Sequence, residues 1–175
     1  MIARVSVLRA SRAWRVGLRL AACAAVVALL VWVANADGVM SVIQGGFARV
    51  SGAVLGLFGE RVSVDGNVVR TDRFAISVVT ACTGLFLTGL FAAAVIASPA
   101  RLRAKLVGIG IGVTGIFAVN VVRLVSLYYV GVHLPGLLDI VHLLIWQSLL
   151  IAFAVGLWLL WAGTWGRRPG REAAE

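Results

Sequence analysis

The residues of this chain that are able to do covalent chemistry lie in three apolar segments that share no local sequence. Cys82 stands in TACTGLF, Arg123 in AVNVVRLVSLYY and His142 in LLDIVHLLIWQ. A thiol with its ordinary pKa of about 8.5 is a poor nucleophile, and a nearby cation favours the thiolate. Arginine keeps its charge, whereas histidine exchanges protons near neutral pH. Together the three side chains are a sufficient set for acyl transfer.

Taken one at a time, these residues also have structural interpretations. A cysteine in a membrane helix is commonly a small apolar filler, and Cys23, in LAACAAV, fits that role. His142 alone fits an interfacial residue, and His133 in the nearby turn is a weaker candidate for the proton-transfer role. Arg123 within a span costs at least about 2.5 kcal/mol, so it needs a partner, a watery cavity or a path to the headgroups.

The composition places these side chains in a membrane. Hydrophobic residues make up 61% of the 175 residues and charged residues only 13%, whereas about a quarter of a soluble domain is charged. The sequence predicts an all-α integral membrane protein with a single membrane domain at 17–163. Apolar runs that reach the length of about 20 residues needed to cross a hydrocarbon core occur at 17–35, 80–98, 106–130 and 140–163.

Basic residues predict the orientation of these spans. The formal net charge is +9, and the basic residues gather in three segments on one side of the spans. By the positive-inside rule the N-terminal segment 1–16, the loop SPARLRAKL and the tail 164–175 are expected in the cytoplasm. The positive charge is therefore assigned to topology and not to nucleic-acid binding. The residues concerned are Arg4, Arg9, Arg12, Arg15 and Arg19, then Arg101, Arg103 and Lys105, then Arg167, Arg168 and Arg171.

The extracytoplasmic segment 36–79 is expected to form two small elements. Residues 39–58 are apolar but carry Gln44 and Arg49, which favours a helix lying at the interface or against the bundle. Residues 60–78 alternate apolar and polar side chains around Asp65-Gly66-Asn67, a β-hairpin pattern that leads into Cys82.

Ala34-Asn35-Ala36, at the end of the first span, also resembles a signal-peptidase cleavage site. The sequence leaves open whether this helix is retained or removed. Either outcome keeps the same orientation for the downstream spans.

On this topology the three chemical side chains meet at one membrane face. Cys82 enters the second span at its outer end, Arg123 lies in the outer half of the third, and His142 lies on the first turn of the fourth. Asn120 is one helical turn before Arg123, on the same face, where its amide is expected to hold the arginine or a substrate carbonyl.

These motifs resemble the exosortase/archaeosortase family of membrane-embedded cysteine transpeptidases. ACTGL is similar to the family's A-C-S-G pattern, NVVR is similar to its N-x-x-R pattern, and a histidine heads the next helix; the resemblance covers about 75–160. It implies Cys82 as nucleophile, Arg123 as stabiliser of the thiolate or oxyanion, and His142 as general acid/base. The chain departs from the pattern at Thr83, where the family usually has serine, and has no acidic residue just before Cys82.

The resemblance also implies a substrate and a location. The substrate is a C-terminal sorting signal, with a short motif, a transmembrane helix and a basic tail, on an exported protein. A compact, short-form enzyme in a bacterial or archaeal cytoplasmic membrane would cleave it at the extracytoplasmic face and transfer it to a surface, lipid or glycan acceptor. Asn120, Thr83 and Gly84 are expected to support the site, and no metal or cofactor is implied.

The sequence leaves other functions open. Water in place of the acceptor would make the protein a simple protease. A non-enzymatic transport or assembly subunit, in which Arg123 binds an anion or pairs with Asp139, predicts that Cys82→Ala is silent. Other intramembrane protease classes lack support, because the chain contains no HExxH, no GxSG and no paired intramembrane aspartates.

Overall fold

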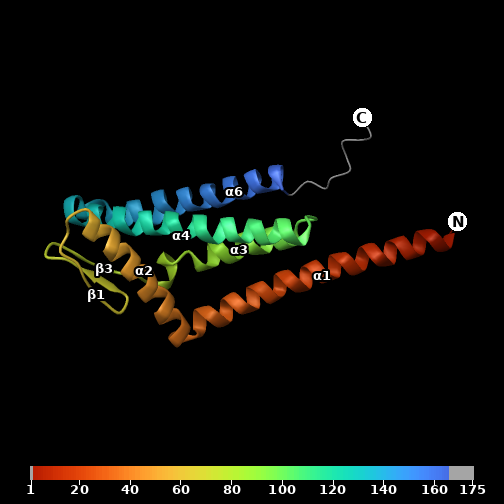
Figure 1. Ribbon diagram of the computed structural model, residues 1–175, viewed down its shortest axis with the longest axis horizontal. Helices are drawn as coiled ribbons and strands as arrows, with labels where there is room; N and C mark the ends of the chain where they lie inside the picture. The colour runs from red at the N-terminus through yellow and green to blue at the C-terminus, as the bar shows by residue number, and fades with distance from the viewer. Residues whose placement is uncertain (1, 166–175) are drawn as a thin grey trace.

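The protein is a bundle of apolar helices capped at one end by a tilted helix and a small sheet (Figure 1). The computed structural model describes residues 2–165, with side chains at residue 14 and from residue 16 onward. Four elements run along the long axis: α1 (Ile2–Asn35), α3 (Leu85–Ala97), α4 (Leu102–His133) and α6 (Trp146–Thr164). The basic groups expected at Arg4, Arg9, Arg12 and Arg15 and at Arg167, Arg168 and Arg171 lie outside the side chains that are described.

The predicted fold class, an all-α membrane protein, is confirmed, with a difference in which helices are long. Four helices of the described part are long and apolar enough to cross a membrane: Val16–Asn35, Asp37–Leu57 (α2), Leu102–His133 and Pro135–Thr164. Thus α2 is apolar and long enough to cross, although it was expected as an interfacial helix. It leaves the end of α1 at a steep angle and packs against α4 and the sheet (Figure 1).

The second span is shorter than the predicted 80–98. Helix α3 has only 13 residues, about 20 Å at 1.5 Å per residue, against a hydrocarbon core of about 30 Å. The reason is local, because residues Thr80–Cys82 form a 3₁₀ turn and Gly84 adopts the left-handed conformation at φ 66°. Cys82 therefore lies in an irregular turn just before the helix, not within it.

The fourth span begins with several short helical pieces. Pro135, which cannot continue α4, starts a 3₁₀ turn at Pro135–Leu137, followed by α5 (Leu138–Ile140) and a π-helical segment at Val141–Ile145. Helix α6 then continues the same apolar run. π-Helical segments are often found at functional sites, and this one carries His142.

The predicted hairpin is present and has a third strand. Strands β1 (Ser63–Asp65), β2 (Val68–Arg70) and β3 (Ala75–Ser77) form an antiparallel sheet in the order β1-β2-β3. The turn into β3 is made by Thr71, whose Oγ1 accepts the Arg73 and Phe74 backbone N–H groups, each at 3.2 Å.

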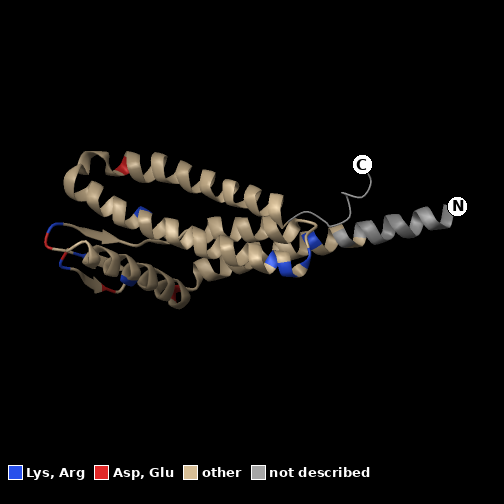
Figure 2. Ribbon diagram, turned by 45° about the horizontal axis from the view of Figure 1, so that its top comes forward, with Lys and Arg blue, Asp and Glu red and all other residues tan. Residues whose placement is uncertain are grey.

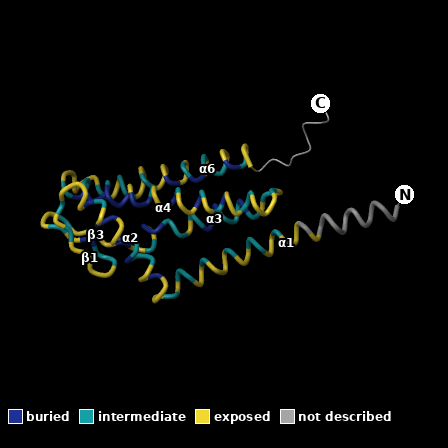
Figure 3. Tube along the Cα trace, viewed as in Figure 1, coloured by how far each residue is buried: buried dark blue, intermediate teal, exposed yellow. Residues whose placement is uncertain are grey.

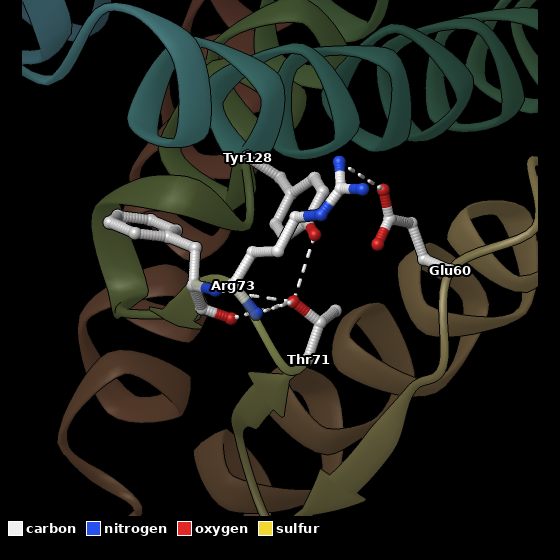
Figure 4. Close-up of polar contacts among 5 residues, drawn as sticks. Glu60, Thr71, Arg73 and Tyr128 are labelled. Atoms are coloured by element: carbon white, nitrogen blue, oxygen red, sulfur yellow. Dashed lines mark hydrogen bonds and ion pairs between the residues drawn. The ribbon is translucent and has the colours of Figure 1, made fainter.

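A hydrogen bond of 2.8 Å between Thr71 Oγ1 and the Tyr128 hydroxyl ties this turn to α4, and Arg73 forms a 3.9 Å ion pair with Glu60 nearby (Figure 4). The sheet is therefore fixed to the helix that carries Arg123.

Buried side chains form two clusters, one under the sheet and one within the bundle (Figure 3). The first joins α2, the sheet and α4 and includes Cys82. The second joins α3, α4 and α6, where glycines permit close packing: a Cβ at Gly112 would lie 2.1 Å from the Phe91 ring, and one at Gly108 would lie 2.5 Å from Trp161 Nε1. Small residues of this kind are typical of helix contacts in membranes.

Charges differ between the two ends of the bundle (Figure 2). Lysine and arginine gather without acidic residues at the end where α3 joins α4, whereas the sheet end carries both signs. At the first end the basic residues Arg101, Arg103 and Lys105 stand at every second position of the chain. Arg19 of α1 lies within electrostatic range of Lys105. Among the described residues, this is the asymmetry that the positive-inside rule requires.

Candidate functional site

The Cys82 thiol is presented by a turn between β3 and α3. The Cys82 backbone N–H donates to the Val79 carbonyl at 2.8 Å, and the Thr83 hydroxyl donates to the Thr80 carbonyl at 2.8 Å. Thr83 Oγ1 also accepts the Leu85 N–H at 3.3 Å. The Thr83 hydroxyl therefore holds the turn together, and its proton is already engaged.

Gly84 brings the two sequence motifs into contact. Its φ of 66° lies in the left-handed region that favours glycine. A Cβ at this position would lie 2.3 Å from Asn120 Nδ2 and 3.0 Å from Asn120 Cγ. The glycine of ACTGL thus rests on the asparagine of NVVR, and this contact sets the Cys82 turn against α4.

Asn120 is fully buried and bonds to its own helix. Its Nδ2 donates to the Ile116 carbonyl at 2.8 Å, and its Oδ1 has no hydrogen-bond partner within the described structure. No hydrogen bond joins it to Arg123 among the described residues, so of the two expected roles, holding the arginine or a substrate carbonyl, the first has no support.

His142 is the histidine that reaches the thiol. Its Nε2 lies 3.7 Å from Cys82 Sγ, a long contact for a thiol–imidazole hydrogen bond. The thiol is buried, with the cysteine 4% exposed, and the imidazole is partly buried. His133, the weaker candidate, instead stacks on Tyr129 with ring centroids 6.4 Å apart.

Arg123 completes the site from α4. It is 3% exposed, and its Nε has no hydrogen-bond partner in the described part of the chain. It lies within electrostatic range of both Cys82 and His142. Asp139, a possible partner in the sequence, forms no ion pair with Arg123 among the described residues. The guanidinium is thus a buried cation within electrostatic range of a thiol and an imidazole.

The registry of α4 against α6 explains why Arg123 and His142 meet. Near the basic end, Trp161 Nε1 donates to the Ala104 carbonyl at 2.9 Å. Nineteen residues farther along α4 comes Arg123, and nineteen residues back along the antiparallel α6 segment comes His142. At 1.5 Å per residue both lie about 28 Å from the anchoring pair. The structure therefore brings Cys82, Arg123 and His142 to one depth from three separate elements.

One polar contact at the site was missed by sequence reasoning. Gln44 of α2 donates from Nε2 to Thr80 Oγ1 at 3.3 Å, so α2 holds the turn that carries Cys82. The signal in the sequence is a polar amide inside an apolar run. Cys23 lies apart, with Sγ 3.6 Å from the Ala93 carbonyl, and both cysteines are free.

The sequence was compared with models of known protein families. Residues 2–162 match the family model described as transmembrane exosortase. The matched range includes all of the described helices except the last two residues of α6, and all three strands. No curated protein and no solved structure matches the chain.

Proposed function

Because this chain belongs to the transmembrane exosortase family, whose role is of the membrane transpeptidase type, we propose that it is a cysteine transpeptidase that cleaves C-terminal sorting signals. The observation that carries the proposal is the contact of 3.7 Å between Cys82 Sγ and His142 Nε2 with the buried Arg123 in range of both. A nucleophile, a proton carrier and a fixed positive charge are the groups that acyl transfer by a thiol needs.

The charge asymmetry supports an orientation for the reaction. The end with Arg101, Arg103 and Lys105 lies in the cytoplasm by the positive-inside rule, and the site at the sheet end faces outside. The substrate's helix enters the bundle from the lipid with its basic tail on the cytoplasmic side. Its scissile peptide, just before that helix, then lies about 28 Å higher, at the level of Cys82.

Acylation follows from the positions of the three side chains. The thiol proton passes to His142, and the thiolate, favoured by the positive charge of Arg123, attacks the scissile carbonyl carbon. The resulting oxyanion is stabilised by the guanidinium. The C–N bond then breaks, the leaving amine takes the proton from His142, and a thioester joins the substrate to Cys82.

The thioester is resolved by an acceptor. An amine or hydroxyl of a surface, lipid or glycan acceptor gives its proton to His142 as it attacks the thioester carbonyl, and the thiol takes the proton back as it leaves. If water attacks instead, the product is a carboxylate and the protein acts as a protease. The transfer reaction is the one that fits the family.

The test follows a reporter through the membrane. An exported reporter ending in a motif, an apolar helix and an arginine cluster, taken from the same source as this chain, is co-expressed with the wild-type protein, Cys82→Ser or the matched control Cys23→Ser. We expect processing with the wild type and Cys23→Ser only. Processing that persists in Cys82→Ser would exclude the cysteine mechanism. Hydroxylamine added to membranes should speed release of the processed reporter, because it attacks thioesters.

Arg123→Lys, which keeps the charge but loses the planar fork of donors, separates two roles of the arginine. Lost processing indicates that the donor geometry is needed, and retained processing reduces the role to charge. The alternative of a non-enzymatic subunit predicts that Cys82→Ala has no effect and that Arg123→Ala is defective. A thiol mechanism instead predicts that Cys82→Ala is inactive.

A further inference from the structure

Strand β3 has an open edge that leads directly to the nucleophile. The strand order β1-β2-β3 gives β3 a strand neighbour on one side only. Val78 N–H donates to the Asn67 carbonyl at 2.8 Å, and Thr71 N–H donates to the Phe74 carbonyl at 2.9 Å. In an antiparallel pair the bonded residues alternate, so Phe74, Ile76 and Val78 turn their backbone groups toward β2.

The alternate residues turn their backbone groups away from the sheet. Ala75 and Ser77 direct their N–H and C=O groups outward, and none of these four groups has a hydrogen-bond partner within the described structure. Both residues are exposed, and their side chains are small. The extended conformation continues through Val79, at φ −94° and ψ 167°, which is 47% exposed. An outward row of free main-chain donors and acceptors therefore runs from Ala75 to Ser77, and the extended backbone continues to Val79, whose carbonyl accepts the Cys82 N–H.

This edge ends at the reacting thiol. The Val79 carbonyl accepts the Cys82 N–H at 2.8 Å, so a single 3₁₀ turn separates the strand from the nucleophile. The opposite edge strand is β1, and both β2 and β3 lie between it and Cys82 along the chain. An extended peptide paired with β3 would place its backbone within one turn of Sγ, whereas one paired with β1 would not.

We propose that the free edge of β3 binds the sorting motif of the substrate as an added, parallel fourth strand. The proposal rests on the proposed function. Addition of a strand supplies affinity through main-chain hydrogen bonds and needs little side-chain identity at each position. The occupant is an extended peptide that precedes a transmembrane helix.

The direction of the added strand follows from topology. The chain of this protein runs from β3 through Cys82 into α3, toward the basic end. A substrate that continues from its motif into a helix with a basic cytoplasmic tail runs the same way. Parallel pairing therefore puts the junction of the substrate's strand and helix beside the junction of β3 and α3, where Cys82 stands.

Ser77→Pro tests the edge, with Ser77→Ala as its control. Proline removes the outward N–H of residue 77 and breaks no hydrogen bond to β2. Edge strands tolerate proline at positions whose N–H faces away from the sheet. Both variants lose the side-chain contact of 3.3 Å with Asn67. We expect Ser77→Pro to process the reporter at least tenfold more slowly than Ser77→Ala, with equal amounts of protein and equal melting temperatures. Equal rates overturn the proposal.

Disulfide trapping tests the direction and does not depend on how proline is tolerated. Ala75→Cys or Ser77→Cys is placed in a Cys23→Ser, Cys82→Ala background, and single cysteines are moved along the reporter's motif. We expect one motif position to cross-link most strongly, with weaker cross-links two positions away and none at the positions between. Moving from residue 75 to residue 77 should shift the strongest cross-link two positions toward the reporter's helix. A shift away from the helix, or cross-links without alternation, overturns the proposal.

The two proposals fail separately. If Cys82→Ala still processes the reporter, the cysteine mechanism is wrong. If Cys82→Ala is inactive while Ser77→Pro matches Ser77→Ala, the mechanism stands and strand addition at β3 is wrong.

Discussion

Replacing Gly84 with alanine tests whether the contact between the two motifs positions Cys82, the proposed nucleophile. Two costs are expected from the structure. An L-residue at φ 66° pays about 1–2 kcal/mol for the left-handed conformation. The new Cβ would stand 2.3 Å from Asn120 Nδ2 and 3.3 Å from Ile116 Cγ2, and relief of such overpacking typically costs about 1–3 kcal/mol. The sum is about 2–5 kcal/mol.

The overpacking should appear in the reaction rate as well as in stability. Asn120 is fully buried on the long helix α4, so part of the displacement is expected to fall on the short turn that carries Cys82. The contact of 3.7 Å between Cys82 and His142 is already long. A loss of about 1–3 kcal/mol in the transition state corresponds to processing that is about 5- to 150-fold slower.

Gly59→Ala is the matched control for this experiment. Gly59 has φ 89°, and a Cβ there meets nothing within 4 Å, so alanine carries the dihedral cost without the clash. Reporter processing in cells and melting in detergent are measured for both variants. We expect Gly59→Ala to lose about 1–2 kcal/mol of stability and to keep its processing rate. A Gly84→Ala protein as active as Gly59→Ala would refute the positioning role of this contact.

Three further predictions concern the packing and the site. Gly108→Ala should lower the melting temperature, because its Cβ would meet the indole of α6 at 2.5 Å, whereas Gly110→Ala, in open space on the same helix, should be neutral or stabilising. His142→Ala should abolish reporter processing and His133→Ala should retain it; the reverse result would move the proton-transfer role to the outer turn. Tyr128→Phe should cost about 1 kcal/mol in thermal or denaturant unfolding by removing the hydroxyl bond between α4 and the sheet, and an unchanged stability would contradict that anchoring role.

The length of the apolar runs predicted two of the long helices correctly. The runs at 106–130 and 140–163 lie within the helical segments Leu102–His133 and Pro135–Thr164, because a span that lies in lipid must form its backbone hydrogen bonds internally. The alternation around Asp65-Gly66-Asn67 became β1 and β2 as expected. These signals are local in the sequence, so they are readable without tertiary information.

The parts that the sequence did not predict depend on contacts between distant segments. The start of α3 is delayed to Leu85 because Gly84 must lie against Asn120, and the apolar run through residue 80 gives no sign of that contact. Thr71 ends β2 and leads into the third strand, because its hydroxyl accepts the Phe74 N–H of the turn and bonds to the Tyr128 hydroxyl. Likewise, the structural role of Gln44 depends on its hydrogen bond to Thr80, which lies 36 residues away in the sequence.

The unpartnered state of Arg123 is what the proposed chemistry requires of it. A buried donor without a partner costs about 1–3 kcal/mol, and the guanidinium Nε is such a donor in the described structure. A donor already bonded to a carboxylate, such as that of Asp139, would exchange one anion for another when the oxyanion forms and would gain little. An unpaired donor has no such hydrogen bond to give up, so its bond to the oxyanion is new in the transition state, and only interactions that strengthen there accelerate the reaction. The cost in stability is therefore coupled to the rate, and an acidic residue introduced within reach of Arg123 should stabilise the fold while slowing processing.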